Sequence, residues 1–357
     1  STDSDSYVAL VAPRIVQAGT VNVDGSIAYI AAEQADLTIN SRNLFTIEIP
    51  VGGGTGDANG VVHSGTTTGP ARTPQTGPFN PDNQVIYGTA GPKNQAMTML
   101  LSGRLGYTPA NVAVTQQDGS ILLSAGGGDI ISSTFSSRLS NIFDPAADAN
   151  INISNANFTN DVTAFANNDV DLIASGGQSI TGSQDVNTLD LNFTAGENIL
   201  LSAASDTTGI NIDGNLTLRA GTGSQGGTIN LVATGSGTTA PRMGQIIVTN
   251  RLQADASNPR PSRFSEDNGP DAFGGTINVD VSAAGLLQAG SLNLIANANP
   301  FTGNVTTGQS TGGDITINLS GTGSLIDITS SLSATANGSS TTNFNTSTGN
   351  SGFGGNV

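Results

Sequence analysis

The chain has 357 residues, a net charge of −16 and no cysteine, and only 11% of its residues are charged. No cluster of Lys and Arg is present, so nucleic acid is excluded as an expected partner. No stretch approaches 18 apolar residues, so no transmembrane helix is expected, and stability must come without disulfides. The 47 glycines, together with many Ser, Thr and Asn residues, indicate short strands joined by tight turns.

Alternation of apolar and polar residues begins near the amino terminus, in "GTVNVDGSIAYIAAE". With a period of two, Val21, Val23, Ile27 and Tyr29 face one side, and Gly25 lies in a turn. Helical periodicity is almost absent. The opening "STDSDSYVAL" has neither the basic start nor the apolar core of a signal peptide, so any export signal is expected outside this sequence.

Further short strands follow at close spacing, separated by Gly, Asn or Asp. They are "GSILLSAGGGDI" from Gly119, "DVDLIASGG" from Asp169, "ENILLSA" from Glu197, "GNLTLRAGTG" from Gly214, "GTINLVATGSG" from Gly227, "GTINVDV" from Gly275 and "GSLNLIANA" from Gly290. Such runs are typical of a chain made almost entirely of β-strands.

Two long polar segments interrupt these strands. Residues 51–83 are rich in Gly, Thr and Pro, and residues 257–273 are charged and rich in Pro, so both are expected to be loop insertions. A third irregular segment, residues 132–150, is expected to hold one helical turn at Arg138–Phe143.

The carboxyl-terminal third repeats itself. A Gly-Gly pair precedes each repeat, at Gly226–Gly227, Gly274–Gly275, Gly312–Gly313 and Gly354–Gly355. A second signature lies between the pairs, as "LQADA" at Leu252, "LIANA" at Leu294 and "LSATA" at Leu332. The period over residues 226–355 is roughly 40 residues, which is typical of solenoid units. Because the last pair ends the sequence, we expect the chain to be a segment of a longer polypeptide.

These patterns predict an all-β fold, a right-handed parallel β-helix (solenoid) extending over residues 1–357 with long polar loop insertions. Val, Ile, Leu and Ala would form inward ladders, and Asn, Ser, Thr and Asp would line the outside. The main alternative is a pair of antiparallel β-sandwiches, which should show Asn-Gly hairpin turns between strands. Asn59–Gly60 and Asn337–Gly338 instead fall in polar stretches.

Few residues are candidates for chemistry. The single histidine, His63, is expected to be exposed and inert in a loop, since a triad needs a nucleophile and a carboxylate beside it. Asp169 and Asp171 share one strand face, and a carboxylate pair of this kind can act on a glycosidic bond. A solvent face of an acidic solenoid gives the same pattern, so no catalytic, cofactor-binding or metal-binding residue is assigned and no enzyme is expected.

Metal binding and glycosylation receive little support. "GGTGDANG" (53–60) and "GGGDI" (126–130) are fragments of calcium-binding repeats without the tandem order, so no cofactor is expected. The Asn-x-Ser/Thr triplets are expected by chance in a chain of this composition. They start at Asn152, Asn157, Asn192, Asn215, Asn304, Asn318, Asn337 and Asn345.

The stretch "SYVALVAPRIVQAGTVNVDGSIAYIAAEQADLTI" resembles the filamentous-haemagglutinin-like exoproteins of Gram-negative bacteria, which are β-helical adhesins exported by two-partner secretion. "VVHSG", "GPKNQAMTMLLSGRLGY" and "GSILLSAGGGDI" continue the resemblance to about residue 130, and the later repeats are similar in a more general way. The chain has only "NPDN" at Asn80–Asn83 where such proteins carry Asn-Pro-Asn motifs, so the segment recognised by the outer-membrane transporter is expected upstream.

The resemblance implies an adhesive or structural segment of a secreted or cell-surface exoprotein. Its partners would be the outer-membrane transporter of two-partner secretion and a glycan or cell-surface ligand, contacted by the two loop insertions. The first alternative is a self-assembling extracellular filament subunit, a homopolymer. The second is a β-helical enzyme that degrades polysaccharides.

Overall fold

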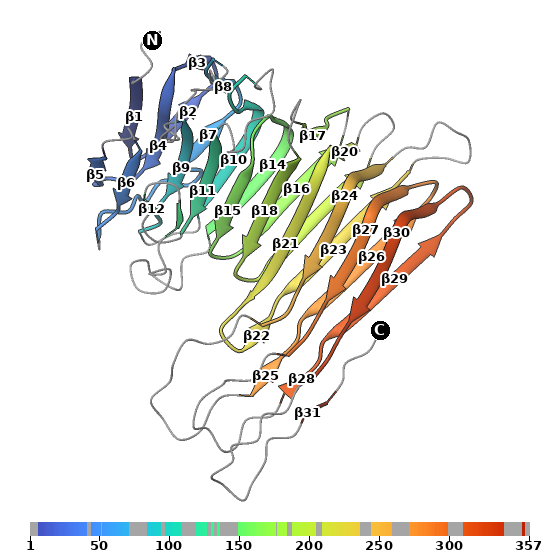
Figure 1. Cartoon of the computed structure of the whole chain (residues 1–357). Coiled ribbons are helices and arrows are strands. Elements are labelled where there is room, and N and C mark those ends of the chain that lie inside the picture. The colour runs from blue at the N-terminus through green and yellow to red at the C-terminus, as the bar shows by residue number, and fades with distance from the viewer. Residues whose placement is uncertain are drawn as a thin grey trace, which may run out of the picture. The chain divides into compact units, whose positions relative to one another are not determined.

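The computed structural model describes most of the chain, and all regular elements in that part are β-strands (Figure 1). The described residues are 6–40, 44–50, 52–70, 84–93, 97–108, 119–126, 130–131, 134–135, 149–175, 177–183, 188–204, 209–235, 244–258, 271–298, 310–338 and 352–353. They include no helix long and apolar enough to span a membrane. The prediction of an all-β fold is therefore confirmed for these residues.

The chain divides into two compact units. Unit 1 consists of Ser1–Ile173, Gln178–Phe193 and Asn211–Asn215, and unit 2 of Ala174–Gly177, Thr194–Ile210 and Leu216–Val357. The division falls within four strands: β16 (Val170–Ser175), β18 (Leu189–Ala195), β20 (Gly209–Ile212) and β21 (Gly214–Thr222).

Unit 1 contains three rows of parallel strands. The first row is β2 (Ile15–Gln17), β7 (Val61–His63), β10 (Met97–Leu105), β14 (Ala149–Phe158) and β16. The second is β3 (Thr20–Asn22), β8 (Thr66–Thr68), β10, β14 and β17 (Ile180–Gly182). The third is β1 (Ser6–Ala12), β4 (Gly25–Ala31), β9 (Val85–Ala90), β11 (Ser120–Ala125), β15 (Val162–Ala166) and β18. Parallel pairing overturns the antiparallel sandwich as an alternative for these strands.

The third row has no register shift from β1 to β15, so like residues stack into ladders. In the third row, Ile27, Ile86, Ile121 and Val162 are aligned and all are buried. Each fully buried aliphatic side chain of this size contributes about 1.5–3 kcal/mol. The expected inward face is thus confirmed for Ile27 and Tyr29.

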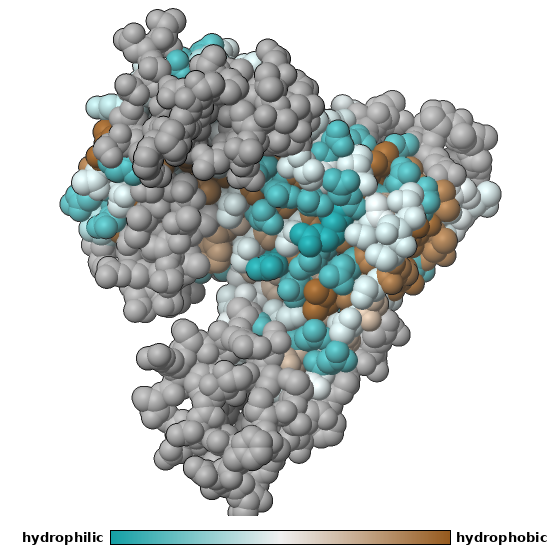
Figure 2. Space-filling view, in the orientation of Figure 1, coloured by the Kyte–Doolittle hydropathy of each residue, from teal (hydrophilic) through white to brown (hydrophobic). Residues whose placement is uncertain are grey.

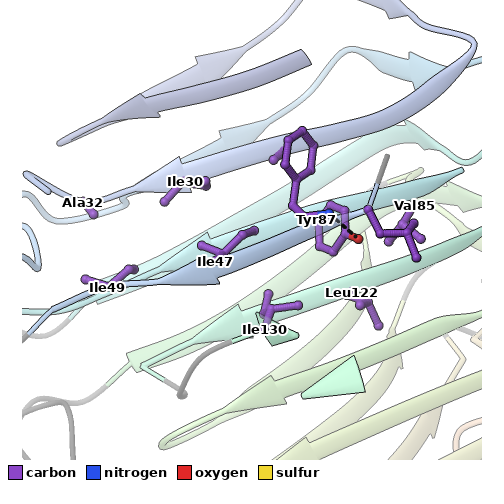
Figure 3. Packing of buried hydrophobic residues seen from close by; sticks show 11 residues of the cluster. Ile30, Ala32, Ile47, Ile49, Val85, Tyr87, Leu122 and Ile130 are labelled. Atoms are coloured by element: carbon purple, nitrogen blue, oxygen red, sulfur yellow. Dashed lines mark hydrogen bonds between the residues drawn. The ribbon is translucent and has the colours of Figure 1, made fainter. Parts of the chain in front are cut away.

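A small antiparallel sheet covers the other face of three strands in the third row. It is formed by β5 (Asp36–Ile39), β6 (Phe45–Glu48), β12 (Ile130–Ile131) and β13 (Thr134–Phe135). Figure 3 shows Ile47 and Ile130 of this sheet facing Ile30 and Tyr87. The Phe45 amide donates a hydrogen bond of 3.2 Å to the Tyr87 hydroxyl. Because both faces are covered, every residue of β4 and β9 is buried.

Unit 2 repeats one pattern of parallel strands. One row is β19 (Asn198–Ala204), β23 (Thr228–Thr234), β26 (Thr276–Ser282) and β29 (Asp314–Ser320). A second is β21, β24 (Gln245–Asp255), β27 (Leu286–Ile295) and β30 (Leu325–Thr335). A short third row is β22 (Gln225–Gly226), β25 (Ala272–Phe273), β28 (Ser310–Thr311) and β31 (Gly352–Phe353).

The Gly-Gly pairs align between neighbouring strands of unit 2. Ile229, Ile277 and Ile315 are aligned across β23, β26 and β29. Each of them lies two residues after a glycine, so Gly275 lies beside Gly227 and Gly313 beside Gly275. A β-carbon on Gly275 would overlap the Gly227 carbonyl oxygen, which accepts a hydrogen bond of 2.9 Å from the Thr276 amide. Glycine is therefore required by close approach of two backbones. Gly354–Gly355 lies outside the described residues.

The second repeat signature has a different register from the expected one. The stack aligns Leu252 with Leu292 and Leu292 with Leu332. The expectation placed the middle copy at Leu294, two residues too far along the chain. Both leucines point inward with a period of two, so the sequence pattern alone did not distinguish them.

The expected loop at 51–83 is wrong at Val61–His63 and Thr66–Thr68, which form strands. Residues 52–70 contain β7 and β8, and residues 71–83 lie outside the described residues. In the expected loop at 257–273, Ala272–Phe273 forms β25, while 259–270 are not described. The helical turn expected at Arg138–Phe143 also lies outside the described residues.

Candidate functional site

His63 is the first correction among the candidate residues. It ends strand β7 and is 1% exposed, whereas the sequence predicted an exposed loop residue. Its register partners are Gln17 in β2 and Leu101 in β10, so it occupies an inward ladder position. The sequence does hold a signal that was missed: "IVQAGT" and "VVHSGT" are copies of one pattern, and the structure aligns them residue by residue.

Hydrogen bonds determine the proton positions around His63. The Ser102 carbonyl can only accept, so Nδ1 of His63 donates to it at 2.7 Å. Nε2 of His63 must then accept from the Thr67 hydroxyl at 2.9 Å. Thr67 in turn accepts from the Tyr29 hydroxyl at 2.8 Å. One continuous chain of donors thus joins three buried side chains from three strands.

This network stabilises the fold and does not have the arrangement of a catalytic triad. Nδ1 of His63 binds a backbone carbonyl in place of a carboxylate, and burial keeps substrate away from the ring. Burial lowers the pKa of His63, and its hydrogen bond to Ser102 raises that pKa by less. Burial also raises the pKa of Tyr29. The imidazole is therefore neutral at pH 7.

Asp169 and Asp171 lie together on an outward face of unit 1. Asp171 is aligned with Asn152, between the buried residues Val170 and Leu172. The Asp169 amide donates to Oδ1 of Asn150 at 3.0 Å. The predicted shared face is thus observed, and amide side chains of the preceding strand flank the pair.

The two carboxylates repel each other. Partial burial raises the pKa of Asp171, and the charge of Asp169 raises it further. The neighbouring Asn side chains do not titrate, so the pair has the surroundings of a polar outward face of a sheet. In the described ranges, no group of three or more His, Asp or Glu side chains is placed to hold a metal ion.

Replacement Asp171→Asn is expected to raise the free energy of unfolding of unit 1 at pH 7 by a few tenths of a kcal/mol. The raised pKa means that the folded state binds the proton more tightly, so the charged form at pH 7 destabilises it. The gain should disappear as pH falls below the folded pKa. Urea unfolding at pH 7 and pH 3 measures both values, and exposed Asp36→Asn is the control. A loss of stability at pH 7 would contradict the repulsion.

The Asn-x-Ser/Thr triplets are mostly part of outward polar rows. Asn157 donates to Oγ1 of Thr181 at 2.7 Å, and Asn215 donates to Oδ1 of Asp190 at 2.8 Å. Asn304 and Asn345 lie outside the described residues. Rungs of amide, hydroxyl and carboxyl groups therefore line the outside of the parallel rows.

The most unusual surface in unit 2 is the edge formed by β29 and β30, called here the β29–β30 edge. Ile317, Leu319 and Leu332 are 41%, 52% and 55% exposed. Their partners in the preceding strands, Val279, Val281 and Leu292, are buried. Figure 2 shows hydrophobic atoms along the side where Figure 1 places β29 and β30. Ladder positions that are buried elsewhere therefore face solvent here.

Comparison with known protein families, curated proteins and solved structures found no match to this chain.

Proposed function

We propose that the chain forms a right-handed parallel β-helix and serves as a rigid segment of an adhesive exoprotein. The observation that carries this proposal is the in-register stacking of parallel strands in rows within each unit. Parallel neighbours in one sheet need crossover connections, and these are right-handed in nearly all proteins. Three rows in each unit supply the faces of such a coil.

The mechanism is mechanical. Stacked strands satisfy one another's backbone hydrogen bonds along the whole row, so the scaffold resists local opening. Two long polar segments separate strands in the sequence, and segments held on a rigid scaffold are well suited to contact a ligand. Residues 71–83 and 259–270 are the proposed contact segments. Outward amide groups add a polar surface in unit 2, as where Asn278 donates a hydrogen bond of 2.9 Å to Asn230.

The proposal extends to the setting of the protein. The resemblance at residues 7–130 supports a secreted or cell-surface protein of a Gram-negative bacterium, exported by an outer-membrane transporter of two-partner secretion. The acidic, cysteine-free composition is consistent with such a setting. Co-expression with a transporter of this class, followed by detection of the full-length exoprotein in the medium, tests the export step. Retention inside the cell would contradict it.

Binding without turnover is the expected activity. The purified chain is applied to an array of neutral and acidic polysaccharides, and replacement of residues 259–270 by a Gly-Ser linker of equal length should weaken retention at least tenfold. Replacement of residues 71–83 in the same way tests the second proposed contact segment. Circular dichroism should be unchanged in both variants. Retention that survives both replacements, or no retention by the parent chain, would contradict the adhesive function.

Two alternatives give different outcomes in the same assay. A polysaccharide-degrading enzyme would release reducing ends from the array, and Asp169→Asn or Asp171→Asn would abolish that release. A filament subunit would sediment as a polymer with or without polysaccharide.

A further inference from the structure

Arg104 occupies an outward position in the second row of unit 1. The next residue, Leu105, is buried, so by alternation Arg104 faces outward, where it is partly exposed. In the stack it lies between Thr66 of β8 and Asn157 of β14. Its amide donates a hydrogen bond of 2.9 Å to the Gly65 carbonyl, which fixes the backbone. A positive charge is thus held at one defined place on the row.

The guanidinium of Arg104 has no counter-charge in the described part of the chain. Lys93, by contrast, pairs with Glu33 at 2.8 Å. Nε of Arg104 is enclosed by protein and has no hydrogen-bond acceptor, whereas its two terminal nitrogens are not enclosed. A buried donor without an acceptor costs about 1–3 kcal/mol. The hydrogen-bonding capacity of this side chain is therefore unused within the described residues.

The row around Arg104 offers hydroxyl and amide groups. Its outward members are Thr20, Thr66, Asn157 and Thr181, and none of these four is charged. Asn157 donates to Oγ1 of Thr181 at 2.7 Å, so that hydroxyl keeps its own proton for another acceptor. Parallel strands lie about 4.8 Å apart, so groups on neighbouring strands can contact one sugar ring. A single cation therefore lies among groups that can hydrogen-bond sugar hydroxyls.

The chemistry of the ligand follows from the guanidinium. Its planar N–H groups match the two oxygens of a carboxylate and bind them through parallel hydrogen bonds. The net charge of the chain, −16, repels a ligand that carries many negative charges. A sugar with a single carboxylate therefore fits this position better than a polyanion or a doubly charged phosphate.

We propose that Arg104 binds the carboxylate of an acidic sugar, and that the hydroxyl and amide groups of its row contact the sugar ring. The site is formed by strands of unit 1 and is additional to the proposed contact segments 71–83 and 259–270. The inference rests on the adhesive function proposed above for the carbohydrate nature of the ligand, and it names the class of sugar.

Ligand-observed saturation-transfer NMR of the full chain tests the site. The probes are methyl glucuronide and methyl glucoside, which differ only in the carboxylate. The parent chain should bind methyl glucuronide with a dissociation constant at least tenfold lower than that for methyl glucoside. Arg104→Met should abolish this preference. Arg104→Lys keeps the charge without the planar pair of donors, and it should lose most of the preference.

Controls separate this site from general electrostatics and from folding. Arg14→Met removes an exposed arginine of the same unit, and its preference should stay within twofold of that of the parent chain. Arg104→Met removes an unbonded buried donor, so its free energy of unfolding in urea should be no lower than that of the parent. An equal concentration of inorganic phosphate should leave the methyl glucuronide signal unchanged.

Three results would overturn the inference. They are equal binding of the two probes by the parent chain, an unchanged preference in Arg104→Met, and displacement of methyl glucuronide by phosphate. Retention of the same chain on the polysaccharide array reports the adhesive function independently, so failure of this site is distinguishable from failure of that function.

Discussion

Replacement Gly275→Val is expected to lower the free energy of unfolding of unit 2 by about 3 kcal/mol. A side chain at this position would overlap the Gly227 carbonyl oxygen, and the two strands would have to separate. The hydrogen bonds from the Gly275 amide to Ala256 and from the Thr276 amide to Gly227 would weaken together. The loss arises from stacking, because the backbone of Gly275 is not among the positive-φ glycines.

Amide hydrogen exchange measures this effect within unit 2. Protection of β23, β26 and β29 should fall in Gly275→Val, because the register of all three depends on the same contact. The matched control is Gly19→Val, since a β-carbon on Gly19 meets no atom within 4 Å. Equal losses in both variants would mean that a side chain weakens the fold even where it has room, and close stacking would not be the cause.

Unit 1 is expected to lose stability on mild acidification, and His63 is expected to cause most of that loss. Burial lowers the pKa of His63 in the folded state, while the unfolded chain protonates it near the ordinary value of 6.5. Below that pH the unfolded state binds more protons, so stability present above pH 6.5 is lost as pH falls toward the folded pKa. The slope is at most about 1.4 kcal/mol per pH unit for one group.

The hydrogen-bond network explains why protonation is resisted. A second proton on His63 must be donated to Thr67, which already accepts from Tyr29 and would accept this bond on its second lone pair. The Thr67 hydroxyl proton would then lose His63 as its acceptor. Buried donors without acceptors cost about 1–3 kcal/mol. The network of Tyr29, Thr67 and His63 contains no carboxylate, so it offers the imidazolium no group of opposite charge.

Tyrosine fluorescence gives a selective readout, because the four tyrosines, Tyr7, Tyr29, Tyr87 and Tyr107, all belong to unit 1. Urea unfolding is followed by this signal between pH 5 and pH 8. His63→Gln should be less stable than the parent at pH 8 and nearly independent of pH across this window. If the variant keeps the parent's slope, another group controls the acid sensitivity.

Sequence reasoning was most successful for the repeated strands. Alternation in "GTINLVATGSG" and "GTINVDV" predicted which residues point inward, because successive side chains of a strand face opposite sides whatever lies beyond them. The positions of the Gly-Gly pairs could also be identified from the sequence, since glycine at a fixed place in a repeat indicates close backbone approach. Both properties are local or periodic, so the order of residues alone is enough to identify them.

Other features depend on segments that are distant in the sequence. Ala28 and Ile30 looked outward by alternation, yet they are buried because Phe45, Ile47 and Ile130 cover them from another part of the chain. His63 looked like a loop residue because its triplet is short and lies among Gly and Thr. Its strand forms only by pairing with β2 and β10.

The sequence by itself thus determined the all-β class, the inward faces and the repeat in the carboxyl-terminal third. The tertiary structure alone decided the burial of His63, the covering sheet, the register at Leu292 and the exposure of Leu332. The physical reason is that strand period is set by covalent geometry within a few residues, whereas register and burial are set by whichever strand lies alongside.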